Sequence, residues 1–156
     1  MQSMESRTWT GEHETTGDAR AVLAAQAWIG TPYVLGAALR GKGCDCVGLV
    51  RGVWADVTGN PVPAVPPWRA DWVNSKARVL VDAARKYLEP VPMDQAAPGT
   101  VLVLRMQNRE AHCGILDFNG RFIHAVENVG VRSVPSKAFI PQIAFAANFP
   151  ITSREA

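Results

Sequence analysis

The hydrophobic pattern of the chain changes its period at Pro90 and Pro92. Before these prolines, apolar residues recur every three to four positions, which is the spacing of one face of an α-helix. After them, apolar residues alternate with others, which is the period of a β-strand. Helices first and strands afterwards predict an α+β domain, with the helices packed on one side of a mostly antiparallel sheet. The 156 residues, 47% of them hydrophobic, suffice for one domain with a substantial core.

Three helices and five strands are expected from periodicity, capping residues and turn residues. The helices follow the candidate N-caps Asp18, Asp45 and Ser75 and end at Ile29, Val57 and Leu88, with Gly30 and Gly59 as stop signals. The strands are expected at residues 101–106, 111–117, 121–127, 131–134 and 143–149.

The two ends of the chain differ in character. Residues 1–17 are polar and without periodicity, and they predict a flexible or partner-docking arm that precedes a single domain at residues 18–156. The start lacks the features of a signal peptide, and no run is long enough to span a bilayer, so we expect synthesis in the reducing cytoplasm and no membrane insertion. The net charge of +2 and the absence of basic runs give no support for nucleic-acid binding.

Cys46 is the candidate nucleophile because it stands at the start of the second expected helix. Unpaired backbone N–H groups and the positive end of the helix dipole stabilise a thiolate there. Two histidines, His112 and His124, follow far downstream on adjacent expected strands. A lone buried cysteine more often has only a packing role. The helix start and the two distant histidines favour instead a thiol hydrolase whose site is assembled by folding.

Four short motifs occur in order, each of them weak by itself. They are Gly30-Thr31-Pro32-Tyr33, Asp45-Cys46-Val47-Gly48-Leu49-Val50, His112-Cys113-Gly114-Ile115 and Phe122-Ile123-His124-Ala125. Together they resemble the NlpC family of cell-wall cysteine peptidases over roughly residues 19–149. The run from Gly43 to Trp54 is similar to the branch found in phage tails and gene transfer agents. This resemblance implies a papain-like α+β core that hydrolyses the peptide stems of peptidoglycan, with no cofactor.

The resemblance also implies a role for each matched residue. Cys46 would attack the carbonyl carbon, and His112 would keep the thiol deprotonated and later protonate the leaving amine. His124 would hydrogen-bond the far nitrogen of His112 and fix its tautomer. Tyr33 and Asp45 would bind the substrate. Backbone N–H groups at the start of the 46–57 helix could donate to the oxyanion.

The catalytic interpretation requires a particular hairpin register. A two-residue turn at Asn119-Gly120 would put His112 and His124 on opposite faces of the sheet. A three-residue loop, residues 118–120 with Gly120 in the left-handed conformation, puts them on one face. It also sets His124 opposite Gly114, which we expect to leave room for the imidazole.

The other cysteines are expected to be structural. Strand alternation points Cys113 away from His112, towards the other face of the sheet, as a buried core thiol. Cys44 lies outside the helix start and is expected to pack under the loop. The Cys44–Cys46 spacing is not that of zinc ligands, so no metal site is expected. Trp68 and Trp72, after a proline-rich connector, could line a groove for sugar or peptide or cap the core equally well.

Three functions remain open from the sequence. The first is a thiol endopeptidase that acts on peptidoglycan stem peptides and is carried by the tail of a phage-like particle, with hub or tail-tip proteins as partners. The second is a structural hub or tail-tip protein with a little-used peptidase fold. The third is an acyltransferase or amidase that acts on another acyl substrate. The intact set of Cys46, His112 and His124 disfavours the second.

Overall fold

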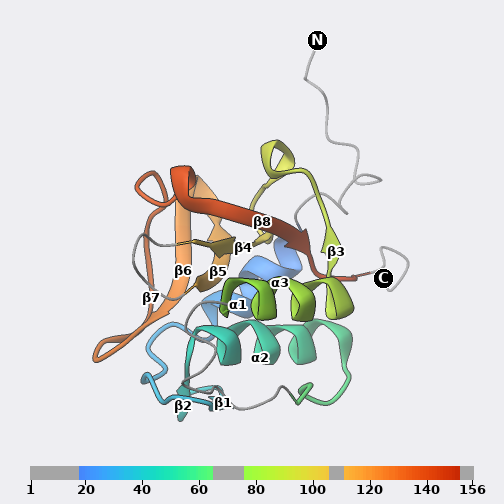
Figure 1. The fold of residues 1–156 in the computed structure, drawn as a ribbon. Helices are drawn as coiled ribbons and strands as arrows, with labels where there is room; N and C mark the ends of the chain where they lie inside the picture. Colours follow the sequence, from blue (N-terminus) through green and yellow to red (C-terminus); the bar gives the residue numbers. More distant parts are fainter. Residues whose placement is uncertain (1–17, 65–75, 106–110, 152–156) are drawn as a thin grey trace.

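An antiparallel sheet of six strands, in the order β3-β8-β4-β5-β6-β7, is the centre of the fold (Figure 1). The computed structural model describes residues 18–64, 76–105 and 111–151. The strands are β3 (Glu89–Pro90), β4 (Val101–Leu104), β5 (His112–Asp117), β6 (Arg121–Val126), β7 (Gly130–Pro135) and β8 (Ile143–Asn148). The helices are α1 (Ala19–Gln26), α2 (Cys46–Thr58) and α3 (Lys76–Tyr87). The predicted α+β class, with helices before an antiparallel sheet, is confirmed.

Three very short strands were not predicted from the sequence. They are β3 at the edge of the large sheet and the pair β1 (Ala38–Leu39) and β2 (Gly43–Cys44), which forms a separate antiparallel ladder. A strand of two residues is too short to show an alternation of apolar and polar side chains, so only its backbone pairing identifies it as a strand. Strand β4 ends at Leu104, earlier than expected.

The helix caps follow the local sequence closely. The Asp18 side chain accepts a hydrogen bond from the Arg20 N–H, and Gly59 ends α2 in the left-handed conformation with φ 77°. The first helix is shorter than predicted: α1 ends at Gln26, and turns lead to Gly30. Because the chain leaves the helix there, Trp28 is buried while Ile29 is 45% exposed. Ser75, Trp68 and Trp72 lie outside the described residues.

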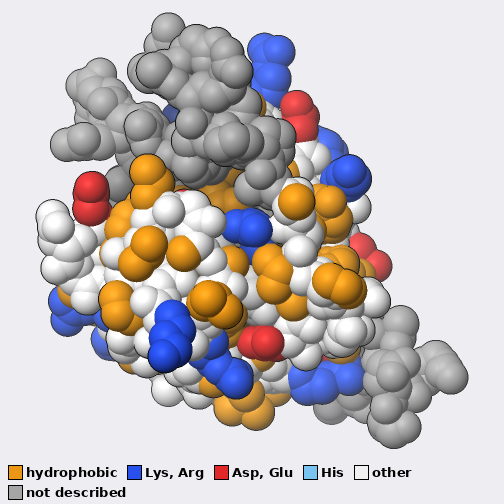
Figure 2. Space-filling model, turned by 90° about the horizontal axis from the view of Figure 1, so that it is seen from below, with side chains coloured by type: hydrophobic (Ala, Val, Ile, Leu, Met, Phe, Trp, Pro, Cys, Tyr) orange, Lys and Arg blue, Asp and Glu red, His pale blue; other side chains and the backbone are white. Residues whose placement is uncertain are grey.

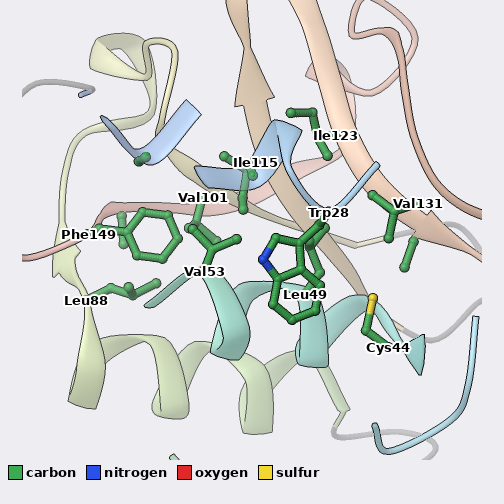
Figure 3. Close-up of a cluster of buried hydrophobic side chains, with 14 of the residues drawn as sticks. Trp28, Cys44, Leu49, Val53, Leu88, Val101, Ile115, Ile123, Val131 and Phe149 are labelled. Carbon is green, nitrogen blue, oxygen red and sulfur yellow. The ribbon is translucent and has the colours of Figure 1, made fainter. Parts of the chain in front are cut away.

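The main core lies between the helices and one face of the sheet. Trp28 and the α2 residues Leu49 and Val53 pack against Ile115 and Ile123 of the sheet, as Figure 3 shows. The opposite face of the sheet carries a second apolar cluster around Leu102, Leu104, Phe122 and Ala146, with Phe139 packed against it. Both faces of the central strands are therefore buried. This explains why the sequence of β4 is continuously apolar and does not alternate between apolar and polar residues.

The face that carries α2, β1 and β2 is chemically mixed. In Figure 2 hydrophobic side chains on this side lie among Lys and Arg side chains, with fewer acidic ones. Leu35 and Leu39 are exposed, and Arg40 and Lys42 follow them in the chain. Within residues 18–64, 76–105 and 111–151, no helix has the length and apolar character needed to cross a membrane.

Candidate active site

The two predicted histidines meet on neighbouring strands of the sheet. His112 begins β5 and His124 lies in β6, and a hydrogen bond of 2.8 Å joins His112 Nε2 to His124 Nδ1. Their ring centroids are 5.1 Å apart and the rings are nearly edge to face. The structure thus confirms that both imidazoles share one side of the sheet. Because Nε2 of His112 is bonded to His124, Nδ1 is the nitrogen left to face a substrate or a thiol.

The β5–β6 connection has the length that this arrangement requires. Asp117 pairs with Arg121 and Ile115 with Ile123, so the loop contains three residues, Phe118–Gly120. Gly120 has φ 70° and Asn119 has φ 61°, and both lie in the left-handed region. The predicted three-residue loop with Gly120 at positive φ is therefore confirmed.

Replacing Gly120 with Val should destabilise the hairpin by about 1–2 kcal/mol, because a β-branched residue resists the left-handed conformation. A Cβ at this position would meet nothing within 4 Å, so the cost comes from the backbone alone. Urea unfolding measures the loss, and hydrolysis should fall with it as the histidine register is disturbed. Gly120→Asn is the matched control, since Asn tolerates this conformation. Equal stability of the Val and Asn variants would contradict the argument.

Gly114 supports the histidine pair in a different way from the one expected. A Cβ on Gly114 would lie 2.5 Å from the Phe122 ring and 2.6 Å from the Ile123 carbonyl oxygen. The Phe122 ring is therefore the group that comes closest to the glycine, rather than the imidazole. Phe122 in turn packs against the His124 ring, with centroids 5.1 Å apart, and Phe139 approaches the same ring at 5.4 Å. No role for either phenylalanine was predicted from the sequence, although Phe122 opens the fourth motif and precedes His124 by one strand period.

Burial decides the protonation state of His124. The side chain is only 8% exposed, and this burial, together with His112 and Arg132, lowers the pKa of His124 to about 4. His124 is consequently neutral at pH 7, and one of its ring nitrogens is an acceptor. When His112 carries two protons, its Nε2–H can donate to Nδ1 of a neutral His124. His124 can thus accept a hydrogen bond from a protonated His112 without carrying a positive charge of its own.

Folding stability should fall as the pH drops from about 6.5 towards 4, because unfolded His124 binds a proton that the folded form refuses. The difference of at most one proton gives a slope of up to about 1.4 kcal/mol per pH unit, less any solvent screening. Urea unfolding at several pH values measures it. A His124→Gln variant keeps a polar group but does not titrate, so its profile should be flatter in this window. Identical profiles for the two proteins would contradict the assignment.

Cys46 is the first residue of α2 and lies beside the start of β5. The thiol of Cys113 donates a hydrogen bond of 3.3 Å to the Cys46 carbonyl oxygen. Cys113 is the chain neighbour of His112, so this contact brings the beginning of α2 to the end of β5 that carries His112. Cys46 is buried, in a cluster with Val47, Ala111 and Cys113. We predict that the Cys46 thiol lies within about 4 Å of an imidazole nitrogen of His112.

Asp45 is the N-cap of α2, as predicted, and it also ties the preceding loop to the helix. One carboxylate oxygen accepts from the Gly48 N–H at 2.7 Å, and the other accepts from the Gly36 N–H at 2.7 Å. The side chain is only 2% exposed. Its observed contacts are therefore structural, and its role in substrate binding stays a prediction. The Gly48 N–H is committed to this carboxylate, which removes it from the possible oxyanion donors.

Tyr33 lies on a segment that joins the two sides of the site. The Val34 N–H donates to the Cys44 carbonyl and the Cys44 N–H donates to the Pro32 carbonyl, so Tyr33 is bridged to the residues just before Cys46.

The same segment also contacts the large sheet, because the Val131 N–H of β7 donates to the Thr31 carbonyl. Through β7, β6 and β5, one continuous series of pairings leads from Tyr33 to both histidines. All five predicted site residues therefore belong to connected elements.

The remaining cysteines are placed as predicted. Cys44 is fully buried, and its burial, followed by Asp45 and Cys46, raises its pKa to about 12, which makes it a poor nucleophile at neutral pH. Cys113 faces the helices and packs with Leu80 and Val103. Among the described residues, no three His, Cys, Asp or Glu side chains come together as a metal site requires. The absence of a metal or cofactor from the working protein remains a prediction.

Comparison with known proteins points to one family. The model of the NlpC/P60 family matches residues 30–146. The solved NlpC/p60 domain of the peptidoglycan hydrolase SagA is 26% identical, covers 84% of this chain and 97% of that domain, and superposes with a TM-score of 0.59. A comparison with curated proteins gave no match.

Two more distant structures share the fold. The P60 domain of antigen MAP1204 from Mycobacterium avium subspecies paratuberculosis is 18% identical over 90% of this chain and 97% of that one, with a TM-score of 0.56. NlpC2 from Trichomonas vaginalis is 17% identical over 91% of this chain but only 49% of its own length, with a TM-score of 0.62. The fold thus occurs both as a solved domain by itself and within longer chains.

Proposed function

Because the chain belongs to the NlpC/P60 family, whose members are generally cysteine peptidases and peptidoglycan hydrolases, we propose that it is a cysteine endopeptidase that cuts peptide stems of bacterial peptidoglycan. The observation that carries the proposal is the hydrogen bond between His112 of β5 and His124 of β6. The start of β5 also contacts the backbone of Cys46. Acyl transfer by a thiol needs a base whose second nitrogen is held by another group. Here that group is a neutral histidine rather than an acid.

In the proposed reaction, His112 takes the proton of Cys46 and the thiolate sulfur attacks the carbonyl carbon of the scissile amide. The developing imidazolium keeps its Nε2–H, which donates a hydrogen bond to Nδ1 of His124, and transfers its Nδ1 proton to the leaving amine nitrogen. The C–N bond then breaks and a thioester remains on Cys46. His112 next deprotonates a water molecule that attacks the thioester, which releases a carboxylic acid and restores the cysteine. Proton and electron counts balance without a cofactor.

Digestion of purified peptidoglycan tests this proposal. Mass spectrometry of the soluble products should find muropeptides with a new amino terminus and a new carboxyl terminus within the peptide stem. The same experiment identifies the bond that is cut. Release of shortened glycan strands with intact stems, or no release beyond that of a Cys46→Ala control, would rule out the proposed activity.

We further propose that the enzyme works as a tail-associated hydrolase of a phage-like particle, in contact with hub or tail-tip proteins. The support is the run from Gly43 to Trp54, which resembles that branch of the family, and the polar segment at residues 1–17, which lies outside the described residues. In this proposal a particle assembled in the cytoplasm carries the enzyme to the cell wall.

Deleting residues 1–17 should leave hydrolysis of soluble stem peptides within about twofold of the full chain but should prevent incorporation into particles. The segment precedes the first cap, Asp18, so no described helix or strand is removed. Hydrolysis is measured with the purified protein, and incorporation by immunoblotting of purified particles. Lost hydrolysis with normal incorporation would reverse the proposed division of labour.

A further inference from the structure

An arginine that the proposed mechanism does not use stands beside the histidine pair. Arg132 of β7 pairs with His124 of β6. Residues directly opposite in an antiparallel pair point to the same face of the sheet, so the Arg132 side chain leaves the sheet on the side of His112 and His124. The residue is exposed. It is close enough to His124 for its charge to be among the causes that lower the pKa of that histidine.

The same arginine adjoins the Tyr33 segment. Its chain neighbour Val131 accepts a hydrogen bond from the Gly30 N–H and donates one to the Thr31 carbonyl, both at 2.9 Å. A Cβ on Gly130 would lie 2.7 Å from that carbonyl, so only glycine allows the two backbones to approach this closely. Arg132 is therefore flanked by His124 on one side and by the segment leading to Tyr33 on the other. Arg132 is thus an exposed residue that adjoins the site.

The charge of Arg132 is not neutralised by its surroundings in the described part of the chain. No ion pair or hydrogen bond of its side chain occurs among those residues, and Glu127 of the same turn does not pair with it. Asp45 is buried and holds two backbone N–H groups, and His124 is neutral at pH 7. A guanidinium stays charged at any working pH and offers a planar fork of donors that matches a carboxylate. The geometry thus leaves a positive charge, unpaired among the described residues, on the side of the sheet that carries both histidines.

We propose that Arg132 is a specificity-determining residue that binds a free carboxylate of the peptide substrate. The inference rests on the proposed peptidase function, because the site is taken to hold a peptide. Two strand spacings, about 10 Å, separate β5 from β7. An extended peptide covers that distance in about three residues. The recognised carboxylate therefore lies within about three residues of the bond that is cut, and its amidation removes the charge without changing its shape.

The test separates binding from hydrolysis. In a Cys46→Ala background, titration calorimetry measures the affinity of two matched stem peptides, one with a free side carboxylate and one with the carboxamide at the same position. We expect the carboxylate peptide to bind about tenfold more tightly, since charge-assisted hydrogen bonds contribute about 1.5 kcal/mol. Adding Arg132→Gln should abolish this preference by weakening only the carboxylate peptide. Arg78→Gln, an exposed arginine on α3, is the control for loss of one positive charge and should keep the preference.

Each outcome decides the inference. Equal affinity for the two peptides, or an Arg132→Gln protein that keeps the preference, overturns it. An equal loss for both peptides also overturns it, because that result assigns Arg132 a role in the fold or in holding His124 rather than in recognition. Arg132→Lys should retain part of the preference, since it keeps the charge but not the fork. If Cys46-intact protein hydrolyses neither peptide while the binding preference stands, the proposed activity fails and the carboxylate site does not.

Discussion

Replacing Cys46 with alanine is expected to reduce peptidoglycan hydrolysis by at least a thousandfold, because the thiolate that forms the covalent intermediate is lost. Stability should change by less than about 1 kcal/mol, since only one sulfur atom is removed from a side chain at the start of α2. Release of soluble muropeptides measures the first effect, and urea unfolding measures the second. Turnover near the wild-type rate would refute the thiol mechanism.

The other two cysteines are the matched controls for this experiment. Cys44→Ala and Cys113→Ala should each retain most of the activity, because Cys44 is held protonated by its surroundings and Cys113 faces the helices, away from the side of the sheet that carries His112. Each should instead lose about 1 kcal/mol of stability through the small cavity left in the core. Inactivity of a correctly folded Cys44 variant, with Cys46 intact, would shift the nucleophile assignment.

Gly48→Ala should destabilise the protein by about 3 kcal/mol and remove most of the activity. Alanine normally stabilises a helix relative to glycine by about 1 kcal/mol. At this position, however, its Cβ would overlap the carbonyl oxygen of Ala37 and lie 3.0 Å from Oδ1 of Asp45. The clash pushes the loop that precedes Cys46 away from the helix and strains the Asp45 cap.

Thermal and urea unfolding measure this loss. Gly41→Ala is the comparison, because Gly41 has φ 80° but a Cβ there meets nothing within 4 Å. It should cost about 1–2 kcal/mol from backbone strain alone. A Gly48→Ala protein at least as stable as the wild type would show that the loop at Ala37 can move away at little cost in free energy. The close approach of Gly48 to Ala37 would then not be needed to position Cys46.

Features set by neighbours in the chain could be predicted from the sequence. Asp45 caps α2 and Gly59 ends it because capping depends only on the residues within one turn. The helix start at Cys46 and the inward alternation of Cys113 belong to the same class. The shared side of His112 and His124 was not local in this sense: the catalytic interpretation selected the three-residue loop over a two-residue turn, and the structure has the three-residue loop.

Features that join distant parts of the chain were decided by tertiary structure. The Phe122 ring fills the space at Gly114, and the second oxygen of Asp45 holds the Gly36 N–H. The sequence contains both partners of each contact but not their distance, because contacts between separate elements depend on how these elements pack.

The surroundings of the histidine pair show the same division. The residues predicted that His124 would orient His112, but its neutral state at pH 7 follows from burial and from charges brought near it by folding. Arg132 is an ordinary strand residue in the sequence. It becomes a candidate for substrate recognition only because the β6–β7 register sets it opposite His124 and because β7 hydrogen-bonds the segment leading to Tyr33. The sequence by itself indicated which residues are candidates for the chemistry, through the helix start, strand alternation and the four ordered motifs, which are all local. The charge state of these residues and their neighbours in space depend on the folded sheet.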